Sequence, residues 1–181
     1  MINRPTGFST ARRGLILATL GALALLLLAS TASVDVLTLR FPHRNTAPIT
    51  LARAAPGQQV VLAYTHSVEG TPVEGVFRVG PQRCFEMQQT RYTSVGTGLP
   101  TASANKPTRE GEWFVVEEGN RKLESIRFFS VPENQVRLKV GATTLNIENF
   151  QARGLIELQI QPMSRIRWWW TSLAKPGLAI E

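Results

Sequence analysis

Short apolar runs divided by turns constrain the fold of this chain more than any other feature. Within a run, apolar and polar residues alternate, as Leu37, Leu39 and Phe41 do, and this alternation predicts strands with one buried face. Gly141 and Ala142 form one of the tight turns expected between runs. The predicted strands cover residues 36–41, 58–64, 73–79, 84–92, 112–116, 122–129, 135–140, 143–147 and 154–161, with residues 49–51 as a short edge strand.

About eight to nine short, mainly antiparallel strands predict an all-β domain, either a sandwich or a barrel. No long amphipathic helix lies between the runs, so a βαβ architecture is excluded. The 181 residues suffice for one such domain and a targeting segment. We expect the domain over residues 34–162, and a tail over residues 163–181 in which a short helix could form.

Residues 1–33 form a hydrophobic helical segment of different character. Three arginines precede an uncharged, largely apolar span of 21 residues, from residue 14 to residue 34. At ~1.5 Å per residue, such a helix could cross a hydrocarbon core of ~30 Å, which favours a membrane anchor. A signal peptide cleaved after Ala32 is the alternative. Either way, we expect the domain on the periplasmic, extracytoplasmic side of the cytoplasmic membrane.

Charge and composition argue against two classes of partner. Beyond the three N-terminal arginines, 17 basic and 13 acidic residues are spread along the strands, whereas a nucleic-acid-binding face needs clustered cations. Cys84 is the only cysteine, and His43 and His66 are the only histidines, so Cys-rich and His-rich metal sites are improbable. We therefore expect no nucleic-acid partner, no metal and no cofactor.

The most concentrated polar chemistry lies in residues 64–77, which read Y-T-H-S-V-E-G-T-P-V-E-G-V-F. The candidate functional residues of this stretch are His66, Ser67, Glu69, Thr71, Pro72 and Glu74. A Ser/His hydrolase would need His66 as the base for Ser67, yet strand alternation points these side chains to opposite faces. We therefore expect no catalytic residue here and keep hydrolysis as an alternative. The competing interpretation is that these residues hydrogen-bond to the turn itself, and that the glutamates pair with nearby arginines or line a solvated rim.

A second loop, residues 94–100, reads S-V-G-T-G-L-P. Its backbone N–H groups could hold an anion, although it lacks the lysine and the following helix of a P-loop. A structural turn is the other interpretation. Together with the turn near His66, it could border a pocket, so a small-molecule or anion-binding module is an alternative function. The candidate residues in this loop are Gly96, Gly98, Leu99 and Pro100.

The tail holds three consecutive tryptophans beside basic residues. Such a composition is typical of segments that lie in the headgroup region of a bilayer. The candidate membrane-contacting residues are Arg165, Arg167, Trp168, Trp169 and Trp170. A packed terminal strand or helix with partly buried tryptophans is the alternative, and a stacking platform for bases is a third option.

Together, the two motifs resemble an uncharacterised bacterial domain-of-unknown-function family of small exported or membrane-anchored proteins. Its members are associated with TRAP (tripartite ATP-independent periplasmic) transporters of the TAXI type, and the resemblance covers roughly residues 51–161. It implies a setting of solute transport and supplies no catalytic residues. We therefore expect a non-enzymatic accessory protein whose two motif loops contact the permease or the solute-binding protein.

Overall fold

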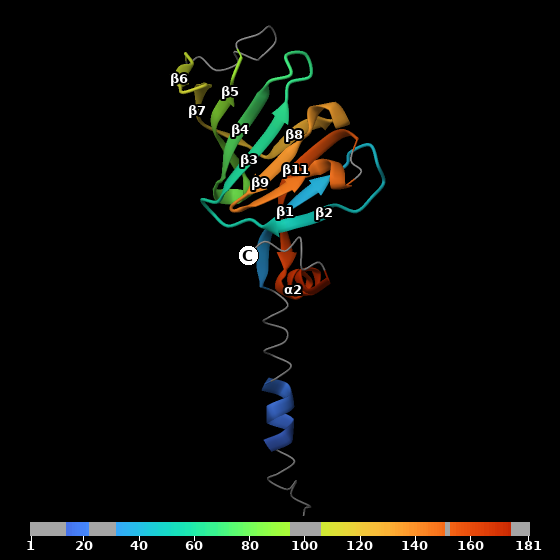
Figure 1. The fold of residues 1–181 in the computed structure, drawn as a ribbon. Helices are drawn as coiled ribbons and strands as arrows, with labels where there is room; N and C mark the ends of the chain where they lie inside the picture. Colours follow the sequence, from blue (N-terminus) through green and yellow to red (C-terminus); the bar gives the residue numbers. More distant parts are fainter. Residues whose placement is uncertain (1–13, 22–31, 95–105, 151–152, 175–181) are drawn as a thin grey trace, which may run out of the picture.

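The computed structural model describes residues 14–21, 32–94, 106–150 and 153–174. From residue 32 onward these residues form two antiparallel β-sheets, with a helix at one end of the domain (Figure 1). The elements are β1 (Ser33–Arg40), β2 (Ile49–Arg53), β3 (Gln59–Thr65), β4 (Pro72–Val79), η1 (Pro81–Arg83), β5 (Phe85–Tyr92), β6 (Thr108–Glu110), β7 (Trp113–Leu123), β8 (Ser125–Ser130), η2 (Pro132–Asn134), β9 (Arg137–Val140), β10 (Thr143–Asn146), η3 (Ile147–Phe150), β11 (Gly154–Ser164) and α2 (Arg165–Ala174).

The strands divide into a four-stranded and a seven-stranded sheet. The first has the order β2-β1-β11-β8, and the second has the order β10-β9-β3-β4-β5-β7-β6. The predicted all-β class and antiparallel pairing are confirmed, and the architecture is sandwich-like. The described strands form two open sheets, so the barrel alternative is wrong. They number eleven rather than eight or nine.

Two of the differences from the predicted strands have a local cause. Residues 117–121 were expected to separate two strands, yet β7 continues through them as a wide bulge. Gly119 and Asn120 adopt positive φ angles of 64° and 58° there, and the ladder with β5 resumes beyond them. The other is β6, whose residues are all exposed at the sheet edge and therefore give no apolar alternation.

The inner faces of both sheets share one hydrophobic core. Leu37 and Leu39 of β1 are fully buried, and Leu138 of β9 lies in the same cluster from the opposite sheet. Val36 and Thr38 are buried too, so β1 is covered on both faces rather than on the one face that the alternation predicts. Burying each such side chain stabilises the fold by ~1.5–3 kcal/mol, so the core is the main force that holds the two sheets together. Gly141 begins the predicted tight turn, with a φ of 57°, and joins β9 to β10.

The chain passes from one sheet to the other at Glu124. Leu123 ends β7 opposite Phe85 in the seven-stranded sheet, and Ser125 begins β8 opposite Gln159 in the four-stranded sheet. Among the described strands, β8 pairs only with β11, so its other edge is free. The position of this free edge determines where the domain is hollowed.

At the ends of the chain, the C-terminal helix is confirmed as α2. In the N-terminal segment, residues 14–21 are helical and exposed, while much of the rest of the predicted anchor or signal peptide lies outside the described residues. Within the described part of the chain, no helix combines the length and the apolar character needed to cross a bilayer.

Candidate functional site

The turn at residues 66–71 is held together by His66. The His66 N–H donates to Thr71 O at 2.8 Å, and the Gly70 N–H donates to His66 O at 2.9 Å. The His66 ring folds over the turn, where Nδ1 accepts the N–H groups of Val68 and Glu69 at 3.4 and 3.3 Å. The geometry fits the interpretation in which the histidine hydrogen-bonds to its own turn.

The other polar residues of this turn point in different directions. Ser67 is exposed, and no hydrogen bond joins it to His66 in the described part of the chain. Glu69 is also exposed and accepts a hydrogen bond from Ser94 Oγ at 3.5 Å. Pro72 is exposed and begins β4. The turn therefore presents its polar groups to solvent rather than gathering them around a substrate.

Glu74 has an arginine partner. Arg91 Nη1 lies 3.3 Å from Glu74 Oε2, in register across the β4–β5 pair. The Arg91 guanidinium also stacks over the Trp113 ring, 4.9 Å from its centroid. This carboxylate is engaged in a cross-strand cluster, one of the two roles expected for it. The second motif loop, with Gly96, Gly98, Leu99 and Pro100, lies outside the described residues.

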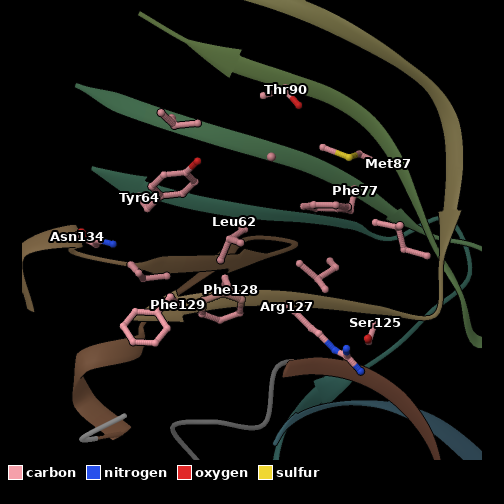
Figure 2. Close-up of a pocket in the computed structure, with 15 residues that line it drawn as sticks. Leu62, Tyr64, Phe77, Met87, Thr90, Ser125, Arg127, Phe128, Phe129 and Asn134 are labelled. Carbon is pink, nitrogen blue, oxygen red and sulfur yellow. The ribbon is translucent and has the colours of Figure 1, made fainter. Parts of the chain in front are cut away.

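A cavity of about 500 Å³ lies between β8 and the inner face of the seven-stranded sheet (Figure 2). Figure 2 shows Leu62, Tyr64 and Phe77 of that sheet facing Phe128 of β8. Most of the lining is apolar, and the exposed ring of Phe129 lies at the cavity mouth. The lining residues are Leu62, Tyr64, Val73, Gly75, Phe77, Met87, Thr90, Leu123, Ser125, Ile126, Arg127, Phe128, Phe129, Asn134 and Val136.

The contribution of β8 to this cavity is unusual. Residues 125–129 are five consecutive positions, and all of them line it. Alternate side chains of a strand point to opposite faces, so a surface touching every residue must run along the strand edge. The cavity therefore lies beside the free edge of β8, at the place where a further strand of the four-stranded sheet would be.

Two polar groups in the lining lack a partner among the described residues. The Asn134 side-chain oxygen is buried and accepts no hydrogen bond. No hydrogen bond is formed by the Tyr64 hydroxyl either, and burial raises the pKa of this group above its ordinary value, so it stays protonated. Thr90, by contrast, donates its hydroxyl to Glu118 at 2.7 Å. The apolar cavity thus offers the Tyr64 hydroxyl to an occupant, while the Asn134 oxygen stays buried within the wall.

Below the cavity, a buried carboxylate fixes the position of β8. Glu157 of β11 accepts hydrogen bonds from Ser125 Oγ and Arg127 Nε, both at 2.8 Å, and Arg40 lies 3.9 Å away. Burial alone would raise the pKa of Glu157, but the hydrogen bonds and the two positive charges outweigh it and hold the pKa below its ordinary value. The cluster ties three strands together and stays ionised at neutral pH.

The two motifs and the cavity-lining residues fall in one segment of the sequence that matches a family model. Residues 60–147 match a family described as a domain of unknown function, DUF1850. This match covers just under half of the chain, from β3 to the first residue of η3. No curated protein and no solved structure matches the chain.

All residues that line the cavity lie within the matched residues 60–147, as does the His66 turn. The strands β1, β2 and β11 lie outside the match, although they complete the core. Within the described residues, no group of three or more His, Cys, Asp or Glu side chains could hold a metal ion. In its described part, the matched segment therefore offers an apolar cavity rather than a cluster of metal-ligating groups.

Sequence reasoning missed the cavity because its walls are distant in the chain. Tyr64 and Asn134 are 70 residues apart, and neither was a candidate functional residue, although Tyr64 begins the stretch of residues 64–77. One sequence signal could have located the wall of the cavity at β8. Glu157 is a single carboxylate in the otherwise apolar start of β11, and such a residue indicates a buried partner on a neighbouring strand.

The basic tryptophan tail forms α2, in which Trp168 is half-buried while Trp169 and Trp170 are exposed.

Proposed function

We propose that this chain is a non-catalytic binding module that takes up an apolar small molecule in the cavity beside β8. The cavity itself is the observation that supports the proposal. Its volume, about 500 Å³, lies within the ~300–1,000 Å³ typical of small-molecule sites. Like such sites, it has an apolar wall with few polar groups, here Tyr64 and Asn134.

The Tyr64 hydroxyl defines the polar chemistry of the ligand. It can donate or accept a hydrogen bond, whereas Asn134 Oδ1 is buried among protein atoms out of reach of an occupant. A ligand with an apolar body and one hydroxyl, amide or protonated carboxyl end suits the Tyr64 hydroxyl. Such a hydrogen bond contributes ~0.5–1.5 kcal/mol, so this end would help to determine which apolar molecules bind.

The transport setting comes from the resemblance to the TRAP-associated family. In that setting the module is an accessory protein on the extracytoplasmic side that contacts the permease or the solute-binding protein. The exposed His66 turn, with Ser67 and Glu69, is a suitable contact surface, because exposed polar loops on a rigid sheet commonly carry recognition. Affinity purification of the tagged chain from detergent-solubilised membranes tests this part, and failure to recover a transporter subunit would count against it.

A second candidate function rests on the free edge of β8. An extended peptide could pair with this edge and place alternate side chains in the cavity, as in β-strand addition. The partner would then be a protein segment rather than a small molecule. A photo-crosslinking amino acid at Phe129 distinguishes the two, since a protein adduct there, absent when the same probe replaces Val68, indicates strand addition.

The hydrolase alternative has little geometric support. His66 Nδ1 already accepts two backbone N–H groups, and Ser67 is exposed beside it without a hydrogen bond between them in the described residues. A general base must reach the proton that it removes. Chromogenic ester substrates, compared between wild type and Ser67→Ala, test this alternative, and equal background rates would eliminate it.

The main proposal is tested with the full chain and an apolar dye, 1-anilinonaphthalene-8-sulfonate. We expect dye emission from wild type and loss of it in Phe129→Asp, because the new charge lies at the cavity mouth. Val68→Asp is the matched control, since Val68 is 78% exposed at the tip of the His66 turn. Equal emission from both variants would overturn the proposed site. Native mass spectrometry of the purified chain then identifies any bound small molecule.

A further inference from the structure

Helix α2 carries an apolar stripe that nothing in the described part of the chain covers. Ile166, Trp169, Trp170 and Leu173 are spaced at i, i+3, i+4 and i+7, which places them on one face of a helix. Their exposed fractions are 41%, 56%, 62% and 57%. Four large apolar side chains exposed on one face mark a contact surface rather than scattered surface residues.

The opposite face of α2 is fixed against the domain. Trp168, Thr171 and Ser172 are half-buried, and the helix packs on β11 and β1. Ser164 caps the helix by accepting the Arg167 N–H at 3.3 Å, and the Arg165 N–H donates to Ala32 O at 3.0 Å. With one face bound in this way, the helix cannot rotate to bury its apolar stripe.

The position of α2 in the fold indicates what covers the stripe. Ser33, the first residue of β1, pairs with Ser164, the last residue of β11, so the helix begins beside the point where the N-terminal segment enters the domain. Residues 14–34 of that segment form the uncharged, apolar span of the sequence. Figure 1 shows α2 at this end of the domain. The apolar stripe of α2 therefore lies at the end where Ala32 and Ser33 begin the domain, directly after the apolar span in the sequence.

The charge of α2 selects among the possible partners. The helix contains Arg165 and Arg167 and no acidic residue, and both arginines are exposed. Exposed tryptophans with adjacent arginines suit the headgroup region of a bilayer, where the rings enter the acyl boundary and the guanidinium groups reach phosphates. Each cation near an anionic leaflet adds to the attraction, because the surface potential of such a leaflet is negative.

We propose that α2 lies flat on an anionic lipid surface, with the stripe Ile166, Trp169, Trp170 and Leu173 inserted at the headgroup boundary. Trp168 stays on the domain side and helps to fix the orientation of the helix. This contact holds the β-domain at a defined angle on the membrane, independently of what the cavity binds.

Depth-dependent quenching by brominated lipids tests the proposal with the full chain in nanodiscs of phosphatidylcholine and phosphatidylglycerol. We expect bromines near the headgroup to quench tryptophan emission, and the double variant Trp169→Phe, Trp170→Phe to lose most of the quenchable signal. The control is Trp113→Phe, which changes a tryptophan of β7 on the distant sheet and should leave the quenchable signal intact. Equal quenching in the double variant and wild type would overturn the proposal.

The charge contribution has its own test. Lowering the phosphatidylglycerol content should reduce quenching in wild type, and the double variant Arg165→Gln, Arg167→Gln should be quenched weakly at every lipid composition. The opposite outcome would be tryptophan emission that is blue-shifted but not quenched by the brominated lipids, together with a dimer of the chain in the nanodisc. It would show that a second copy of the chain, rather than lipid, covers the apolar stripe of α2, and it would overturn the proposal.

Discussion

Arg127 and Glu157 lie directly opposite each other on β8 and β11, and Arg127 Nε donates to Glu157 Oε1 at 2.8 Å. The arginine side chain is 68% exposed, whereas that of the glutamate is 4% exposed. The pair is therefore asymmetric, because removal of the arginine leaves a buried charge and removal of the glutamate leaves an exposed one. β8 carries one wall of the cavity, so this pair also fixes the shape of the proposed binding site.

The first prediction follows from this asymmetry. Arg127→Ala should lower the free energy of unfolding by ~1–3 kcal/mol, since Glu157 then keeps only Ser125 as a hydrogen-bond donor. Arg53→Ala is the matched control, because Arg53 is an exposed arginine on β2 without a partner among the described residues. Urea unfolding of both variants provides the measurement. Equal losses would show that the pair contributes no more than a surface arginine.

The second prediction concerns pH. The pKa of Glu157 is lowered in the folded state, so its stabilising effect is complete above the ordinary glutamate pKa of ~4.3 and is lost as the pH falls through the lower, folded value. Wild type should therefore lose stability more steeply than Glu157→Gln as the solution is acidified below that pH. Chemical unfolding at a series of pH values tests this. Parallel curves would mean that Glu157 does not contribute to the acid sensitivity.

The third prediction concerns the buried acceptor of Asn134. Asn134→Leu removes an unsatisfied polar atom and keeps a similar volume, so the free energy of unfolding should rise by ~1 kcal/mol. Asn134→Asp should lower the free energy of unfolding, because it places a charge in the same buried position. Thermal melting of both variants provides the measurement. A loss of stability in the leucine variant would indicate that the amide already has a partner.

The fourth prediction separates structure from recognition in the His66 turn. His66→Ala leaves the N–H groups of Val68 and Glu69 without their acceptor and should cost ~0.5–1.5 kcal/mol, while Ser67→Ala should leave stability unchanged. If the turn contacts a transporter, solute uptake in cells should fall in both variants. Glu74→Ala, at the adjacent start of β4, should lower uptake as well. Normal solute uptake in both Ser67→Ala and Glu74→Ala would contradict the transporter contact and leave the turn with a structural role only.

Local patterns sufficed to predict most of the strands. The apolar residues Leu37 and Leu39 and the turn at Gly141 indicated the backbone conformation, because side chains on one face of a strand recur every two residues. That both faces of β1 are buried could not be predicted, since Thr38 is polar. The bulge at Gly119 and Asn120 could not be predicted, since the same residues also end strands. The assignment of β8 to the smaller sheet depends on partners about thirty residues away, such as Glu157.

The candidate site was harder to predict than the fold. His66 was predicted to be a functional residue because polar residues crowd around it in the sequence, yet its ring accepts hydrogen bonds from the adjacent backbone. The cavity is built from ordinary core residues, such as Leu62 and Phe128, and no single residue type distinguishes these from other core positions. The cavity exists because the four-stranded sheet ends at β8, and the sequence alone does not specify where a sheet ends.

The fifth prediction concerns Gly75, which forms part of the cavity floor on β4. A Cβ atom at this position would lie 2.9 Å from Phe77 Cε2 and 3.1 Å from Cζ, so Gly75→Ala must push the Phe77 ring toward the cavity. We expect a loss of ~1–3 kcal/mol in the free energy of unfolding, together with weaker dye binding.

Phe77→Leu should relieve this clash, because the smaller side chain leaves room for the new methyl group. The double variant should therefore be more stable than the sum of the two single changes predicts, by ~0.5–3 kcal/mol in a double-mutant cycle. Strict additivity would mean that Gly75 and Phe77 do not share the space. The floor of the cavity would then depend on some contact other than the ring of Phe77 over the bare backbone of Gly75.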